Sequence, residues 1–117
     1  MSDSMIGDQN ALRAVFNPSP MQPYILVLNV ENQGEQVYQK PIVVRDKILA
    51  FTSVDDAVAA AESFFERMRA GKENLPLHNF DRIQLYIAHG YADDLGVDYG
   101  TVFAIVDSKL GRLIDYP

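Results

Sequence analysis

The sequence contains no cysteine and only two histidines in 117 residues. The absence of cysteine excludes disulfide bonds, thiolate catalysis and cysteine-ligated zinc or iron–sulfur sites. No apolar run approaches the roughly 20 residues that a membrane-spanning helix needs. The N-terminus, MSDSMIGDQN, also lacks the basic and then apolar segments of a signal peptide. We therefore expect a cytoplasmic protein that does not associate with membranes.

Sequence motifs for catalysis and for nucleotide binding are also missing. No serine lies in a G-x-S-x-G pattern, and no Walker or dinucleotide-binding glycine pattern occurs. We therefore expect no cofactor. The chain has 16 acidic and 10 basic residues, a net charge of −6, and its basic residues are scattered in small groups. Because nucleic-acid binding requires a concentrated basic face, we expect no nucleic-acid partner.

The clearest local pattern is residues 53–71, SVDDAVAAAESFFERMRAG, which predict one amphipathic helix. Ser53 and Asp56 form an S-x-x-D capping box at its start. Gly71 is suited to end the helix in the left-handed conformation. Apolar residues recur at steps of three and four and so share one face of the helix: Val54, Ala57, Val58, Ala61, Phe65 and Met68. A lone helix of this kind needs a sheet to cover.

Runs rich in β-forming residues flank the helix on both sides. The expected strands are 24–31, 37–44, a short segment 48–51 that leads into the helix, and then 82–89, 101–106 and 112–116. We predict an α+β fold with an antiparallel sheet of about five strands, one long helix packed on one face, and β-β-α-β-β-β order. Residues 24–117 then form a single domain. Pro41 removes a ladder donor, which indicates an edge strand or a bulge.

Residues 1–23 contain three of the six prolines and no strand-like run. We interpret this segment as an N-terminal arm. A short helix within DQNALRAVFN, with Asp8 as its cap, is the alternative. In that case Leu12, Val15 and Phe16 would dock on the sheet or on another subunit.

One helix covers only one face of the predicted sheet. On the other face, strict alternation places several apolar residues together: Tyr86, Ala88, Val102, Ala104 and Val106. An open apolar face of this size is typical of an interaction site. We therefore predict a protein partner and, more specifically, a homodimer.

The segment 89–100, HGYADDLGVDYG, collects the residues most suited to a functional site, and we expect it to be a loop. The predicted partner-contacting residues are Tyr91, Asp93, Asp94, Asp98 and Tyr99. A metal site is not expected, because the spacing of the aspartates matches no EF-hand. His89 shares strand parity with Ile83, Leu85 and Ile87, which predicts a histidine at the edge of the core. A pH switch or a ligand contact is its alternative role.

The lack of catalytic motifs favours a non-enzymatic protein-interaction or regulatory module that acts through the open sheet face and the 89–100 segment. Two alternatives stay open. One is a small enzyme or a ligand- or metal-binding domain that uses His89 with Asp93, Asp94 and Asp98. The other is an acidic inhibitor from a phage or mobile element that presents its carboxylates to a basic partner.

Overall fold

Eight strands and one helix make up the parts of the chain that the computed structural model describes, which are residues 14–70, 80–93 and 96–115. In chain order these are β1 (Ala14–Phe16), β2 (Tyr24–Asn32), β3 (Glu35–Pro41), β4 (Val43–Val44), β5 (Lys47–Phe51), α2 (Val54–Arg69), β6 (Arg82–Asp93), β7 (Gly96–Asp107) and β8 (Gly111–Asp115). The predicted α+β class is confirmed. No helix within these ranges is long and apolar enough to cross a membrane.

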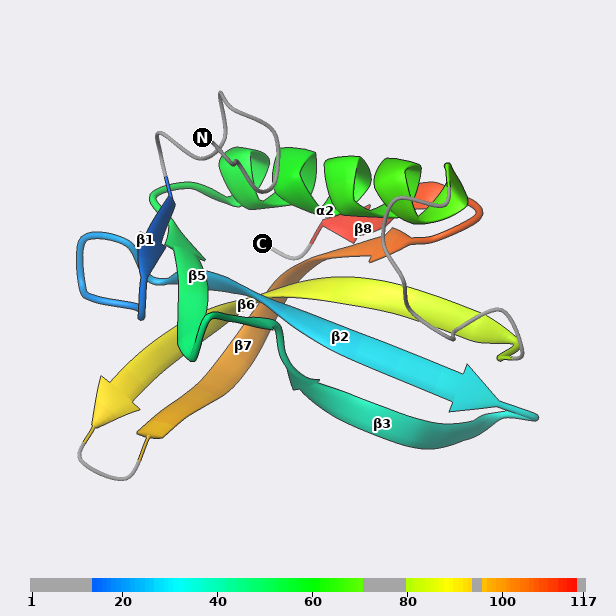
Figure 1. Ribbon diagram of the computed structural model, residues 1–117, viewed down its shortest axis with the longest axis horizontal. Coiled ribbons are helices and arrows are strands. Elements are labelled where there is room, and N and C mark those ends of the chain that lie inside the picture. The colour runs from blue at the N-terminus through cyan, green and yellow to red at the C-terminus, as the bar shows by residue number, and fades with distance from the viewer. Residues whose placement is uncertain (1–13, 71–79, 94–95, 116–117) are drawn as a thin grey trace.

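All strand pairings are antiparallel, and the sheet order is β1-β5-β2-β6-β7-β8. β3 also pairs with β2, along the edge that β2 shares with β5, and β4 pairs with β5. Figure 1 shows α2 lying across one side of the sheet, while the β2–β3 and β6–β7 hairpins extend away from it in different directions. The antiparallel sheet under one helix was predicted correctly, but the strand number and order differ from the prediction.

The additional strands come from segments that the sequence pattern did not resolve. Ala14–Phe16, which lie within the predicted N-terminal arm, form β1 and pair with β5 instead of forming a helix. Asn17 continues this contact, because its side-chain oxygen accepts a hydrogen bond from the Ile48 backbone N–H at 3.3 Å. β4 and β5 form a tight hairpin in which Arg45 and Asp46 both have positive φ. The rest of the proposed short helix, including Asp8 and Leu12, lies outside the described residues.

The helix begins as the capping pattern predicted. Ser53 has an extended backbone, and its hydroxyl accepts a hydrogen bond from the Asp56 backbone N–H at 3.1 Å. Asp55 and Asp56 in the first turn and arginines in the last turn complement the helix dipole. The helix ends at Arg69, and the predicted terminator Gly71 lies outside the described residues.

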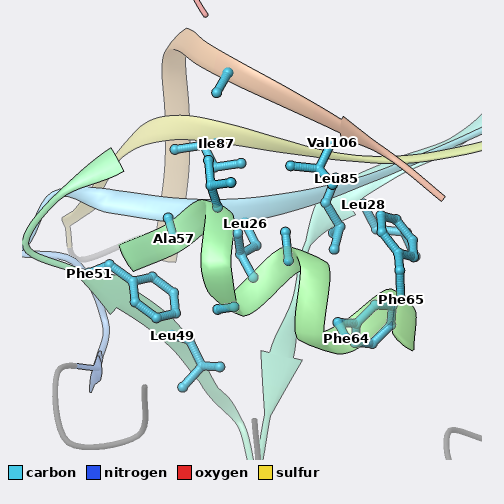
Figure 2. Packing of buried hydrophobic residues seen from close by; sticks show 14 of the residues in the cluster. Leu26, Leu28, Leu49, Phe51, Ala57, Phe64, Phe65, Leu85, Ile87 and Val106 are labelled. Carbon is cyan, nitrogen blue, oxygen red and sulfur yellow. The ribbon is translucent and has the colours of Figure 1, made fainter. Parts of the chain in front are cut away.

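The main core lies between α2 and the sheet (Figure 2). Phe51 and Phe65 are each 1 % exposed, and Phe65 meets the Phe64 ring edge-on with centroids 5.6 Å apart. Three small residues of the helix, Ala57, Ala60 and Ala61, are fully buried and allow the helix to approach the strands closely. Every strand that runs under the helix contributes to this cluster, including Leu26, Leu28, Leu49, Leu85, Ile87 and Val106.

Two bulges in β7 decide which of its residues face the helix. Ile87 pairs with Ala104, but the next residue, Ala88, pairs with Val102, so Phe103 is an extra residue in β7. A bulge of this kind shifts the alternation of side chains between the two faces. The prediction that Val102, Ala104 and Val106 share the open face was therefore wrong. Ala104 and Val106 are buried under the helix, and Val102 packs on the opposite side.

The face opposite α2 has a small core of its own. Ile25, Val27, Ile48, Ala50 and Ala88 are buried there, and Tyr86, Val97, Tyr99 and Val102 pack against them. The Tyr99 hydroxyl donates a hydrogen bond to Gln39 at 2.7 Å, which joins β7 to β3 although β2 and β6 lie between these strands. Such a contact requires a strongly curled sheet. The face that we expected to be open is therefore partly covered by the chain itself.

Candidate functional site

The 89–100 segment is mostly strand. β6 continues to Asp93 and β7 starts at Gly96, so the expected loop reduces to a connection at residues 94–95, which lie outside the described residues. Gly90 pairs with Tyr99, and Tyr91 pairs with Asp98. The glycine and aspartate content suggested a loop, but the ladder continues through this region, which includes the β-forming residues Tyr91, Val97 and Tyr99.

One face of this hairpin carries three of the predicted site residues. His89 and Tyr91 lie two positions apart on β6, with ring centroids 6.1 Å apart, and Asp98 lies opposite Tyr91 on β7. The Tyr91 ring also lies beside the backbone of Gly100, where a Cβ atom would meet it at 3.8 Å. We call His89, Tyr91 and Asp98 the outer hairpin face. Tyr91 is 47 % exposed, and His89 and Asp98 are exposed as well.

The expected position of His89 at the edge of the core was wrong. His89 keeps the strand parity of Ile87, as predicted. The β6–β7 hairpin, however, extends beyond the region that α2 covers (Figure 1), so the same parity that buries Ile87 leaves His89 exposed. A histidine on such a surface is available to a partner or a ligand.

Tyr99 points to the opposite side and takes part in a chain of hydrogen bonds within the molecule. Its hydroxyl donates to the Gln39 side-chain oxygen, and the Gln39 amide donates to Asn29 Oδ1 at 2.9 Å. Asn29 is fully buried, and its own amide donates to Glu31 at 3.0 Å. Burial raises the pKa of Tyr99, and the neighbouring Asp98 carboxylate adds to this effect. The second bulge of β7 lies between Val102, which pairs with Ala88, and Tyr99, which pairs with Gly90. This bulge turns Tyr99 toward the core on the face opposite α2.

The proposed group of three aspartates is only partly visible. Asp98 accepts a hydrogen bond from the Tyr99 backbone N–H at 2.8 Å. Asp93 ends β6, but its side chain and all of Asp94 lie outside the described residues. Among the residues that are described, no three or more histidine, aspartate or glutamate side chains are placed to hold a metal ion.

A groove that the sequence analysis missed lies where β2 changes partner. β2 pairs with β5 at Tyr24 and Ile25 and with β3 from Val27 onward. In between, the Ile42 backbone N–H donates to the Leu26 carbonyl at 2.9 Å. The chain bends here, and a hollow of about 350 Å³ opens, which we call the β3–β4 groove. Its lining is almost entirely apolar: Leu28, Tyr38, Pro41, Ile42, Val43, Val44 and Phe64.

Large apolar side chains are exposed at the rim of this groove. Val43 is 58 % exposed and Tyr38 is 44 % exposed. Both residues, with Pro41, also border a second hollow of about 500 Å³ that continues to the face opposite α2. The proline was the available signal, because it marked an interruption between residues 37 and 44 that we treated as one strand.

Two lysines flank the groove. Lys40 is the register partner of Leu28, and Lys47 is the register partner of Val44. Since register partners point to the same face of a sheet, both lysine side chains start on the face where Leu28 and Val44 line the groove. Lys40 borders the adjacent hollow of about 500 Å³, which shares Tyr38, Pro41 and Val43 with the groove. Both lysine side chains are exposed.

A third hollow, of about 740 Å³, lies between the end of α2 and the β7–β8 turn. Its polar groups serve the fold. Arg69 donates to the Ser108 carbonyl at 2.7 Å, and the buried Asp107 carboxylate accepts from Gln84 and from the Lys109 and Leu110 backbone N–H groups. These internal contacts leave less reason to expect a ligand here than at the β3–β4 groove.

Comparison of the chain with protein-family models, with curated proteins and with solved structures finds no match.

Proposed function

We propose that this chain is a non-enzymatic protein-interaction module. The observation that supports this proposal is the exposure of large apolar side chains at two places on the sheet. Tyr38 and Val43 border the β3–β4 groove, and Tyr91 lies on the outer hairpin face, each between 44 and 58 % exposed. Exposed apolar clusters beside polar residues are typical of protein interfaces, in which tyrosine is enriched.

The simplest partner is a second copy of the chain, and we propose a homodimer at micromolar concentration. We expected a dimer from the sequence because one apolar face of the sheet was uncovered, but the curled sheet covers part of that face. The exposed groove and hairpin now support the proposed dimer. Light scattering over a concentration series tests the dimer directly. A mass near the 13.1 kDa of one chain at every concentration would count against it.

Co-purification from the native cell, followed by quantitative mass spectrometry, tests the broader proposal. We expect at least one protein, the chain itself included, to be recovered less with Tyr91→Ser or Val43→Ser than with the parent chain. Met21→Ser is the matched control, because Met21 is 82 % exposed and borders neither surface. If these surface variants and the control recover the same proteins in the same amounts, the proposal is wrong.

A ligand- or metal-binding domain is the second candidate, because His89, Tyr91 and Asp98 share one exposed face. A metal bound to the folded state would raise the thermal midpoint. We expect no rise with Ca²⁺, Mg²⁺, Mn²⁺ or Zn²⁺ at micromolar concentration. A rise that His89→Ala removes would favour this second candidate over the interaction module.

A further inference from the structure

The distribution of charge along the chain is uneven in a way that its net charge of −6 hides. Residues 83–108, which include nearly all of β6 and β7, contain four aspartates and no lysine or arginine. Residues 36–54, which include β4, β5 and most of β3, contain three basic residues and one acidic residue. The hairpin is therefore negative, and the strands around the β3–β4 groove are positive.

Complementary shapes accompany these opposite charges. The β3–β4 groove has an apolar lining, and Lys40 and Lys47 are the register partners of two of its lining residues, Leu28 and Val44. Lys40 also borders the adjacent hollow of about 500 Å³. The outer hairpin face presents the exposed ring of Tyr91 directly opposite the exposed carboxylate of Asp98. An aromatic side chain in an apolar groove, with opposite charges at the rim, is a common arrangement of interface contacts.

Within one copy of the chain, the outer hairpin face points away from the hollow that adjoins the β3–β4 groove. Ala92 and Val97 pair with each other and border the hollow next to the groove, together with Pro41. Tyr91 and Asp98 form the adjacent register pair, and neighbouring pairs in a strand point to opposite faces. They therefore point away from that hollow and are accessible to another molecule.

We infer that the β3–β4 groove binds the outer hairpin face of a second copy of this chain, with Tyr91 of one copy in the groove of the other and Asp98 beside Lys40 and Lys47. In a two-fold symmetric dimer this contact forms twice. The inference rests on the proposed function and adds to it the surface and the contacts of the homodimer.

Charge reversal with mixing of variants tests this arrangement. Sedimentation velocity would measure the dimer dissociation constant of the full-length parent chain, of Lys40→Glu and of Asp98→Lys. We expect each variant alone to dimerise at least about tenfold more weakly, because each places like charges at both contacts. An equimolar mixture should associate more tightly than either variant alone, because opposite charges meet at both contacts of the mixed dimer. One contact joins the Lys40→Glu groove to the Asp98→Lys hairpin, and the other is the contact of the parent chain.

Lys109→Glu is the matched charge control, since it changes the net charge by the same amount as Lys40→Glu at an exposed position outside the groove. Tyr91→Ser, measured in the same way, should also weaken the dimer, and Leu110→Ser is its control, because Leu110 is 75 % exposed and lies on the β7–β8 turn. Thermal midpoints close to that of the parent chain would show that the variants are folded.

Any one of four results would overturn the inference. One is a parent chain that is monomeric at all concentrations. Another is a dimer that Lys109→Glu weakens as much as Lys40→Glu does. The third is a mixture that associates no more tightly than its components. A dimer that is insensitive to both charge reversals would refute this contact while leaving the interaction module intact. In contrast, surface variants that change neither dimerisation nor co-purification would refute the proposed function as well.

Discussion

Gly90 lies close to Ile25 in the core on the face opposite α2, and replacing Gly90 with alanine is a sharp test of that packing. A Cβ atom built at Gly90 would lie 2.8 Å from Ile25 Cγ2, 2.9 Å from Cδ1 and 3.0 Å from Cγ1. Its backbone N–H also donates to the Pro23 carbonyl at 2.7 Å, which limits movement of the strand.

Gly90→Ala should lower the free energy of unfolding because Ile25 has little room to move. Ile25 is fully buried and β-branched, so its χ1 angle is restricted and no solvent-facing space is available to it. Adding a methyl group to such a packed site costs about 1–3 kcal/mol through displaced side chains and backbone. For a domain of this size that amounts to a thermal midpoint lower by several degrees.

Chemical denaturation of the parent chain, Gly90→Ala, Ile25→Ala and the double variant measures this effect and its cause. Ile25→Ala alone should cost about 2–5 kcal/mol through its cavity. The double variant should cost clearly less than the sum, because the new methyl group occupies part of that cavity. Gly100→Ala is the control, since its Cβ would meet only Tyr91, at an ordinary 3.8 Å. Additive costs, or equal costs for Gly90→Ala and Gly100→Ala, would refute the reasoning.

Two further predictions concern the main core and the hydrogen-bond chain at Tyr99. Phe65→Ala should lower the free energy of unfolding by about 3–5 kcal/mol, because Phe65 is 1 % exposed within the helix–sheet cluster; an unchanged thermal midpoint would contradict the helix-on-sheet packing. The raised pKa of Tyr99 means that the folded state holds the phenolic proton more tightly than the unfolded state, whose pKa is about 10. The associated stability is therefore present below pH 10 and is lost as the pH rises from 10 through the raised value. In urea titrations over that alkaline range, the free energy of unfolding of Tyr99→Phe should fall less with rising pH than that of the parent chain. Equal falls for the two proteins would count against the proposed environment of Tyr99.

The helix was predictable from sequence because its signals are local. The Ser53 cap, the charges at both ends and the three- and four-residue apolar spacing all lie within one short segment, and the structure uses each of them. The sheet under the helix was also predictable from this segment, because the apolar face of the helix needs a sheet to cover and strand-forming runs flank it on both sides. These features do not depend on which distant residues meet.

The strand details depend on register, which the sequence pattern does not specify. Alternation predicted one face for Val102, Ala104 and Val106, but the extra residue Phe103 divides them between two cores. A second bulge in β7 turns Tyr99 inward, whereas Tyr91 on β6 keeps the parity of Ile87 and is exposed, although both tyrosines belong to one predicted contact segment. A bulge is selected by long-range packing on both faces, so a single-sequence alternation rule assigns the wrong face beyond it.

The proposed interaction surface is invisible to motif analysis for a related reason. Its apolar groove exists because Pro41 ends β3 and the chain bends before β4, so residues of ordinary strand composition line a hollow. Its lysines are notable only because the sheet register places them on the face of Leu28 and Val44. Catalytic and metal sites restrict residue type and spacing, whereas a contact surface needs only exposure, shape and charge at positions that the fold brings together. Measurements of association therefore test the proposed surface directly.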